Sequence, residues 1–168
     1  MIGKKIVLLW VLLCPLFGFC NSEHLKPLLI VGCGRSGTEY MATFLRESGL
    51  DINHERIGSD GCVSWPLVVN SFSPWGPITN EEYIHVFHQV RHPLNVITSW
   101  FINLDSLTRD EWVFIRRHIP EIRDHDSLIV QCAKYWYYWN LKAEKMAEWR
   151  YRIEDIDSII PEFGHGSK

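Results

Sequence analysis

The chain has 168 residues, of which 46% are hydrophobic and 22% charged, a composition that excludes wholesale disorder and fits one domain with a buried core. Its 17 basic and 20 acidic side chains leave a net charge of −3, so the whole chain lacks the positive surface that binds nucleic acid. Any anion site must therefore be local. The 8 tryptophans predict either core anchors or flat platforms for a ligand.

Residues 1–20 predict a signal peptide or an N-terminal anchor. Lys4 and Lys5 precede an uncharged apolar run, 6–19, which is shorter than the roughly 20 residues of a bilayer-spanning helix. An uncleaved membrane anchor through residues 6–20 is the main alternative, and a buried helix is the third interpretation. Under the first two, the rest of the chain is translocated across a membrane.

The cysteines beyond this segment are Cys33, Cys62 and Cys132. No pair among them has metal-ligand spacing, and we expect no metal site. An oxidising compartment would permit one disulfide, whereas three small buried side chains are the simpler interpretation.

The first half of the single domain expected over 25–168 alternates between strand and helix patterns. A buried strand over 28–31 precedes a helix over 38–48, which Gly49 closes. A second strand is predicted over 50–54. The Gly-, Ser- and Pro-rich stretch 58–77 predicts a loop.

The second half continues the alternation. A third strand is predicted over 83–90, and Pro93 begins a helix whose apolar side chains share one face, namely Val96, Trp100 and Leu104. A long helix runs from Asp126 to about Trp149, with its aromatic side chains mostly in the core, and a last strand covers 151–154. The order of elements predicts an α/β fold with a parallel sheet.

The segment Gly32–Tyr40 (GCGRSGTEY) lies between the first strand and the first helix, which favours a phosphate site. Glycines let backbone amides turn toward an anion, and the free amides of the following helix attract negative charge. Arg35, Ser36 and Thr38 add donors. An ATP-type P-loop would need Lys and a hydroxyl residue where Thr38 and Glu39 stand, and a dinucleotide fingerprint lacks its acidic partner. An ordinary glycine turn is the remaining alternative.

A second segment, His88–Trp100, places Arg91 at the end of a strand and Ser99 inside the next helix. Such groups can converge on one phosphate, because ligands collect at the carboxyl edge of parallel sheets. The two segments together predict two separate anion sites.

With these segments the chain resembles the sulfotransferases that use 3′-phosphoadenosine 5′-phosphosulfate. The resemblance rests on RSGT at 35–38, RHPLNVITS at 91–99 and YRIED at 151–155. It implies a three-layer, P-loop-like α/β domain with helices on both faces of the sheet. It also implies that the 5′-phosphosulfate is held by Arg35, Ser36, Gly37 and Thr38, and the 3′-phosphate by Arg91 and Ser99. Glu39 stands where the family often has a hydroxyl residue.

The implied reaction moves a sulfuryl group to an acceptor hydroxyl or amine, which needs a base and a cation near the leaving phosphate. Arg35 suits the second task. Family members use Glu or His near the end of the second strand, where His54 and Glu55 stand. Because neighbours on a strand point to opposite faces, only one should enter the site, and Glu55 is favoured. A structural His54 and a surface Glu55 are the alternative.

Family members commonly continue past the YRIED-like strand to a glycine- and basic-rich loop, whereas this sequence ends on GHGSK at 164–168. This predicts a donor site without its C-terminal region. Two alternatives to the sulfotransferase therefore stay open, a P-loop-type kinase or nucleotide hydrolase and a non-catalytic nucleotide-binding module. The acceptor class, whether carbohydrate, protein or small molecule, is not readable from the sequence. A translocated sulfotransferase predicts a place in the secretory pathway, such as the Golgi lumen.

Overall fold

The computed structural model describes residues 25–69, 72–73, 76–77, 82–103 and 109–159. Its main sheet has five parallel strands in the order β2-β3-β1-β6-β7. The strands are β1 (Leu25–Gly32), β2 (Ile52–His54), β3 (Gly61–Ser64), β6 (Glu82–Val90) and β7 (Trp149–Arg152). A separate antiparallel pair joins β4 (Phe72–Ser73) to β5 (Gly76–Pro77). β1 therefore lies at the centre of the sheet.

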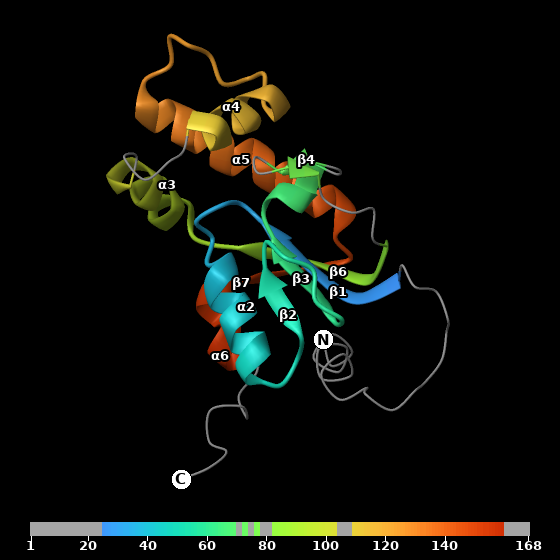
Figure 1. Ribbon diagram of the computed structural model, residues 1–168. Helices are drawn as coiled ribbons and strands as arrows, with labels where there is room; N and C mark the ends of the chain where they lie inside the picture. Colours follow the sequence, from blue (N-terminus) through green and yellow to red (C-terminus); the bar gives the residue numbers. More distant parts are fainter. Residues whose placement is uncertain (1–24, 70–71, 74–75, 78–81, 104–108, 160–168) are drawn as a thin grey trace.

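Helices cover both faces of this sheet (Figure 1). The longer elements are α2 (Thr38–Glu47), α3 (Pro93–Ile102), α4 (Arg109–His118) and α5 (Leu128–Met146). The short ones are η1 (Pro66–Val69), η3 (Ile153–Asp155) and α6 (Ile156–Ile159). Alternate residues of β1 serve the two faces: Leu28 and Ile30 pack with α2, whereas Leu29 and Val31 pack with α5. The predicted three-layer α/β fold is confirmed.

Most of the predicted elements are present, but the loop predicted over 58–77 is wrong, because β3, η1, β4 and β5 all lie within it. Gly61–Ser64 forms β3, which is wholly buried and lies between β1 and β2. Gly61 is required there, because a Cβ atom would lie 1.8 Å from the carbonyl oxygen of Leu28. The chain enters the sheet at a point where only a glycine lets the two backbones approach.

Other boundaries also differ from the sequence prediction: β1 begins at Leu25 and β2 at Ile52. The long helix ends at Met146 rather than near Trp149, because Trp149 begins β7 and pairs with Phe87. The last strand consequently ends at Arg152. Helix α4 was not predicted, and α3 ends at Ile102. Leu104 lies outside the described residues.

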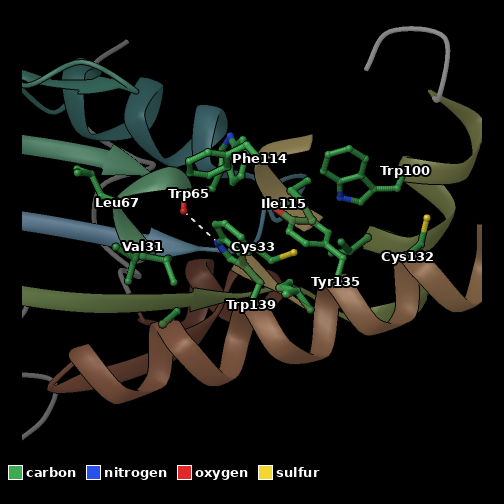
Figure 2. Close-up of a cluster of buried hydrophobic side chains, with 14 of the residues drawn as sticks. Val31, Cys33, Trp65, Leu67, Trp100, Phe114, Ile115, Cys132, Tyr135 and Trp139 are labelled. Carbon is green, nitrogen blue, oxygen red and sulfur yellow. Dashed lines mark hydrogen bonds between the residues drawn. The ribbon is translucent and has the colours of Figure 1, made fainter. Parts of the chain in front are cut away.

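The face of the sheet toward α5 holds an aromatic core, which Figure 2 shows. Trp65, Tyr135 and Trp139 pack with ring centroids 5.3–6.4 Å apart, at distances typical of favourable aromatic pairs. The indole nitrogen of Trp139 donates a hydrogen bond to the carbonyl oxygen of Trp65 at 3.0 Å. Trp100 joins the cluster edge-on to Tyr135. These tryptophans are core anchors, as expected for the long helix.

Cys33, Cys62 and Cys132 are free and buried, as the simpler interpretation of these residues predicted. Burial raises the pKa of the Cys62 thiol to about 12, so this side chain stays a neutral thiol. The predicted leader, 1–20, and the C-terminal GHGSK lie outside the described residues. Among the helices that the structure does describe, none combines the length and apolar character needed to cross a membrane.

His88 on β6 is a buried titratable group. Its side chain is 1% exposed, and its Nε2 atom pairs with the Oδ1 atom of Asn140 at 2.9 Å. Within the described part of the chain, its Nδ1 atom has no hydrogen-bond partner. Burial lowers the pKa of His88, and the contact with Asn140 offsets this only in part. The folded protein therefore holds a neutral imidazole here.

We expect the free energy of unfolding to fall as the pH drops below about 6.5, the ordinary pKa of histidine. In that range His88 binds a proton in the unfolded chain but stays neutral in the folded protein. The slope contributed by one such group is at most about 1.4 kcal/mol per pH unit. Urea unfolding between pH 7.5 and 5.5 measures it. His88→Gln should show a shallower slope, and the same slope in both proteins would contradict the assignment. His118, whose pKa burial also lowers, is present in both.

Candidate functional site

A pocket of about 670 Å³ opens at the carboxyl edge of the parallel sheet. Its walls come from the ends of β1, β2, β3 and β6 and from the helices that follow. The residues that line it are Gly34, Arg35, Gly37, Thr38, Glu39, Tyr40, His54, Glu55, Trp65, Arg91, Ser99, Trp100 and Glu111. This volume suits a small organic ligand, and the carboxyl edge is where open α/β sheets bind theirs.

The loop between β1 and α2 has three consecutive carbonyl groups that each accept a hydrogen bond from a distant side chain. The indole nitrogen of Trp100 donates to the oxygen of Gly34 at 3.1 Å, and the guanidinium of Arg91 donates to the oxygen of Arg35 at 3.1 Å. The side-chain amide of Gln89 donates to the oxygen of Ser36 at 2.9 Å. The orientation of each peptide plane in the loop is therefore fixed from outside.

The amides of this loop divide into two sets. The Gly34 N–H donates to the hydroxyl of Tyr135 at 2.9 Å, and the Ser36 N–H donates to the carbonyl of Cys33 at 3.0 Å. Helix α2 begins after Gly37, and no side chain caps its first turn, so its leading N–H groups lack an intrahelical acceptor. These groups adjoin the pocket and can bind an anion.

Two residues of the loop adopt the left-handed backbone conformation that a tight turn requires. Gly37 has a φ of 88°, which a glycine adopts without strain. Arg35 has a φ of 69°, which is uncommon for a residue with a side chain and concentrates at functional sites. The turn exposes the Arg35 side chain at the mouth of the pocket.

The second predicted segment meets the first in this pocket. The Nε atom of Arg35 donates to the hydroxyl of Ser99 at 3.1 Å, across the opening from α3. Arg91 follows β6 directly, and its carbonyl oxygen accepts a hydrogen bond from the indole of Trp136 at 3.2 Å. The residues predicted for the two anion sites therefore line one continuous pocket.

His54 and Glu55 both line the pocket, which contradicts the expectation that only one of them enters it. The reason is local: β2 ends at His54, and Glu55 has a φ of 55°, so the alternation of an extended strand no longer applies. The Nε2 atom of His54 lies 3.0 Å from the hydroxyl of Thr38 and 3.2 Å from the Oε1 atom of Glu55. The two candidates form a contact pair.

The carboxylate of Glu55 is held by two further donors. The hydroxyl of Ser64 donates to its Oε2 atom at 2.7 Å, and the backbone N–H of Trp65 donates to its Oε1 atom at 3.1 Å. Both donors come from the end of β3, beside β2. Glu55 is therefore oriented by the sheet, and it is less exposed than His54, at 15% against 32% of the side chain.

Ser36 is the one candidate residue that does not line the pocket. Its side chain is fully buried, and its Oγ atom lies 2.8 Å from the position that a Cβ atom of Gly32 would occupy. The backbone of Ser36 still takes part through its carbonyl group. The remaining seven candidates, Arg35, Gly37, Thr38, His54, Glu55, Arg91 and Ser99, come together.

Sequence reasoning did not name six residues of the pocket wall as site residues, namely Gly34, Glu39, Tyr40, Trp65, Trp100 and Glu111. Tyr40 and Glu39 follow the anion loop directly, so their place in the first turn of a helix was a usable signal. Glu111 comes from α4, which the sequence pattern did not reveal. Among the described residues, no group of three or more His, Cys, Asp or Glu side chains is arranged to hold a metal ion.

Comparison with known proteins finds no matching family model, no matching curated protein and no matching solved structure.

Gly34 is enclosed so tightly that a methyl group should not fit. A Cβ atom there would lie 2.8 Å from the hydroxyl oxygen of Tyr135 and 3.2 Å from the Trp100 ring. We expect Gly34→Ala to lower the free energy of unfolding by about 1–3 kcal/mol through overpacking. Tyr135→Phe should cost a similar amount, about 1–3 kcal/mol, because the Gly34 N–H loses its acceptor. Denaturant unfolding measures both.

The double variant tests the collision itself. Removing the Tyr135 hydroxyl makes room for the new methyl group. The double variant should therefore lose less unfolding free energy than the sum of the two single losses, by at least about 0.5 kcal/mol. Fully additive losses would show that the two groups do not compete for the same space.

Proposed function

We propose that this pocket binds 3′-phosphoadenosine 5′-phosphosulfate and transfers its sulfuryl group to a hydroxyl or amine of an acceptor. The observation that carries the proposal is the convergence of two distant segments, 35–38 and 91–99, on one pocket that also contains His54 and Glu55. The resemblance to sulfotransferases implied that these two segments would lie at one donor site. The motif residues would otherwise be unrelated surface groups.

The donor half of the pocket is cationic and rich in N–H groups. The first turn of α2, with Arg35, offers charge and amides to the 5′-phosphosulfate, and Thr38 adds a hydroxyl. Arg91 and Ser99 would hold the 3′-phosphate. Arg35 already contacts Ser99, so the two phosphate positions adjoin each other. A ligand with two phosphate groups suits this arrangement better than one with a single group.

The reaction exchanges one bond of sulfur for another. A lone pair of the acceptor oxygen or nitrogen forms the new bond to sulfur, and the bond from sulfur to the bridging phosphate oxygen breaks. The leaving group is adenosine 3′,5′-bisphosphate, whose new negative charge Arg35 would stabilise. The acceptor proton passes to a base, and no metal is needed for any of these steps.

For the base we propose that His54 and Glu55 act as a pair. Both oxygens of Glu55 accept hydrogen bonds, from Ser64 and Trp65, so this carboxylate is held in a fixed orientation. The protein partners of His54 all lie at Nε2, which leaves Nδ1 to accept a proton. Glu55 would orient the ring by accepting the Nε2–H. This reverses the preference for Glu55 that the sequence suggested.

The pocket wall also contains acidic and aromatic side chains. Glu39 and Glu111 contribute carboxylates, and Tyr40 contributes an exposed ring.

The kinase or hydrolase alternative would need a lysine in the loop, where Thr38 stands instead. Titration with adenosine 3′,5′-bisphosphate, and separately with ATP and Mg²⁺, distinguishes the two classes. Preference for ATP with Mg²⁺ would overturn the sulfotransferase proposal.

Arg91→Ala should weaken binding of adenosine 3′,5′-bisphosphate by about 1.5–3 kcal/mol, or about ten- to a hundred-fold, because one charge-assisted contact is lost. Binding of adenosine 5′-phosphate should weaken by a smaller factor, because Arg91 also holds the carbonyl of Arg35 in the first loop. Arg35→Ala should weaken both ligands, since its proposed partner is the 5′ group. Calorimetric titration measures the four affinities. Equal losses for both ligands in Arg91→Ala would remove this residue from the 3′-phosphate site.

His54→Ala should slow sulfuryl transfer by about 10²–10⁴-fold, the usual contribution of a general base, while donor binding stays nearly unchanged. Glu55→Gln keeps an oxygen acceptor for the ring and should cost less. Turnover of labelled donor at saturating concentration measures both. The reverse order would make Glu55 the base. A parent protein that binds the nucleotide without any turnover would favour the non-catalytic binding module.

A further inference from the structure

The third sequence motif, YRIED, takes no part in the pocket wall, although it contributed to the resemblance. Its residues leave the sheet through β7, the edge strand, and continue into η3. Three of its side chains nevertheless reach the two loops that form the pocket. They are Tyr151, Ile153 and Glu154.

Tyr151 connects to the first loop through a buried relay. Its hydroxyl donates to the Oε1 atom of Gln89 at 2.7 Å, and the Nε2 atom of Gln89 donates to the carbonyl oxygen of Ser36 at 2.9 Å. Gln89 is fully buried and Tyr151 is 6% exposed. Burial raises the pKa of Tyr151 well above its ordinary value, so the hydroxyl keeps its proton. The relay fixes which way the Gln89 amide faces, because only its NH₂ group can donate to Ser36.

Ile153 lies against the same loop. A Cβ atom on Gly37 would meet the Cγ1 atom of Ile153 at 3.5 Å and the Nε2 atom of Gln89 at 3.6 Å. Gly37, the residue before α2, therefore packs close to both Ile153 and Gln89.

Glu154 holds the second loop. Its Oε1 atom accepts a hydrogen bond from the backbone N–H of His92 at 2.7 Å. The same peptide group carries the carbonyl of Arg91, which accepts the indole N–H of Trp136. Both ends of the peptide that follows Arg91 are thus fixed. Burial raises the pKa of Glu154, but the bond from His92 and the neighbouring Arg152 and Arg91 outweigh it and hold the pKa below its usual value.

We propose that Tyr151 and Glu154 are positioning residues of the anion pocket, Tyr151 through Gln89 for the first loop and Glu154 through His92 for the second. They touch no ligand. The identity of the anions rests on the proposed function, whereas the control of the loops by the edge strand does not. A change in either residue should therefore alter one half of the pocket and leave the other half as it was.

The test is ligand selectivity in two variants. Tyr151→Phe removes only the hydroxyl and should weaken adenosine 5′-phosphate and adenosine 3′,5′-bisphosphate alike, by about 3- to 10-fold. Glu154→Ala should weaken the bisphosphate by a similar factor and leave the 5′-phosphate within about 2-fold. Glu154→Gln keeps an oxygen for the His92 N–H and should restore binding. Arg150→Gln, an exposed neighbour on β7 paired with Glu144, is the matched control and should change neither ligand.

Backbone amide exchange supplies a readout that needs no ligand. Amide exchange should become faster at Ser36 in Tyr151→Phe and at His92 in Glu154→Ala, beyond any change in the global free energy of unfolding. Unchanged local exchange, or an equal loss of affinity for both nucleotides in Glu154→Ala, would overturn the positioning role. A wild-type chain that binds neither nucleotide would overturn the proposed function, while the exchange rates would still decide this inference.

Discussion

The orientation of the backbone between Gly34 and Gly37 is the constraint on which the pocket depends. The two polar groups of a peptide point in opposite directions, so holding a carbonyl also aims the next amide. The carbonyls of Gly34 and Ser36 accept hydrogen bonds from Trp100 and Gln89. The amides of Arg35 and Gly37 belong to these same two peptides. The orientation of both amides is therefore set by the protein itself.

The side chains that hold this loop also build the core. Trp100 and Tyr135 are buried, pack edge-to-face at 5.1 Å, and bind the carbonyl and the amide of Gly34. Trp65 packs beside them and lines the pocket. Stability and site geometry consequently share residues, and a substitution in this aromatic cluster acts on both. Such coupling limits the thermal movement of the loop, which favours preorganised binding.

The pocket contains both arginines and carboxylates, and they follow different strands of the sheet. Arg35 and Arg91 lie toward the loops that follow β1 and β6, and Glu55 lies with His54 at the end of β2. In the proposed reaction the first side would hold the donor and the second would accept the proton. β2 and β6 lie on opposite sides of β1, so these two groups of residues come from opposite sides of the central strand.

The sequence by itself determined the local units: the apolar strand 28–31, the glycine turn and the helix from Thr38 follow from patterns over a few residues. The same holds for Arg91 at a strand end and Ser99 in the next helix. β3 was not predictable, because GCVS has no strand pattern of its own and becomes a strand only through pairing with β1 and β2.

Tertiary structure alone decided which side chains meet. The buried hydroxyl of Ser36 and the joint entry of His54 and Glu55 depend on single backbone angles and on neighbours from other strands. The relay from Tyr151 to Ser36 joins residues far apart in the sequence. Periodicity reports which face of an element is buried, but the partner on that face is set by the packing of the whole sheet.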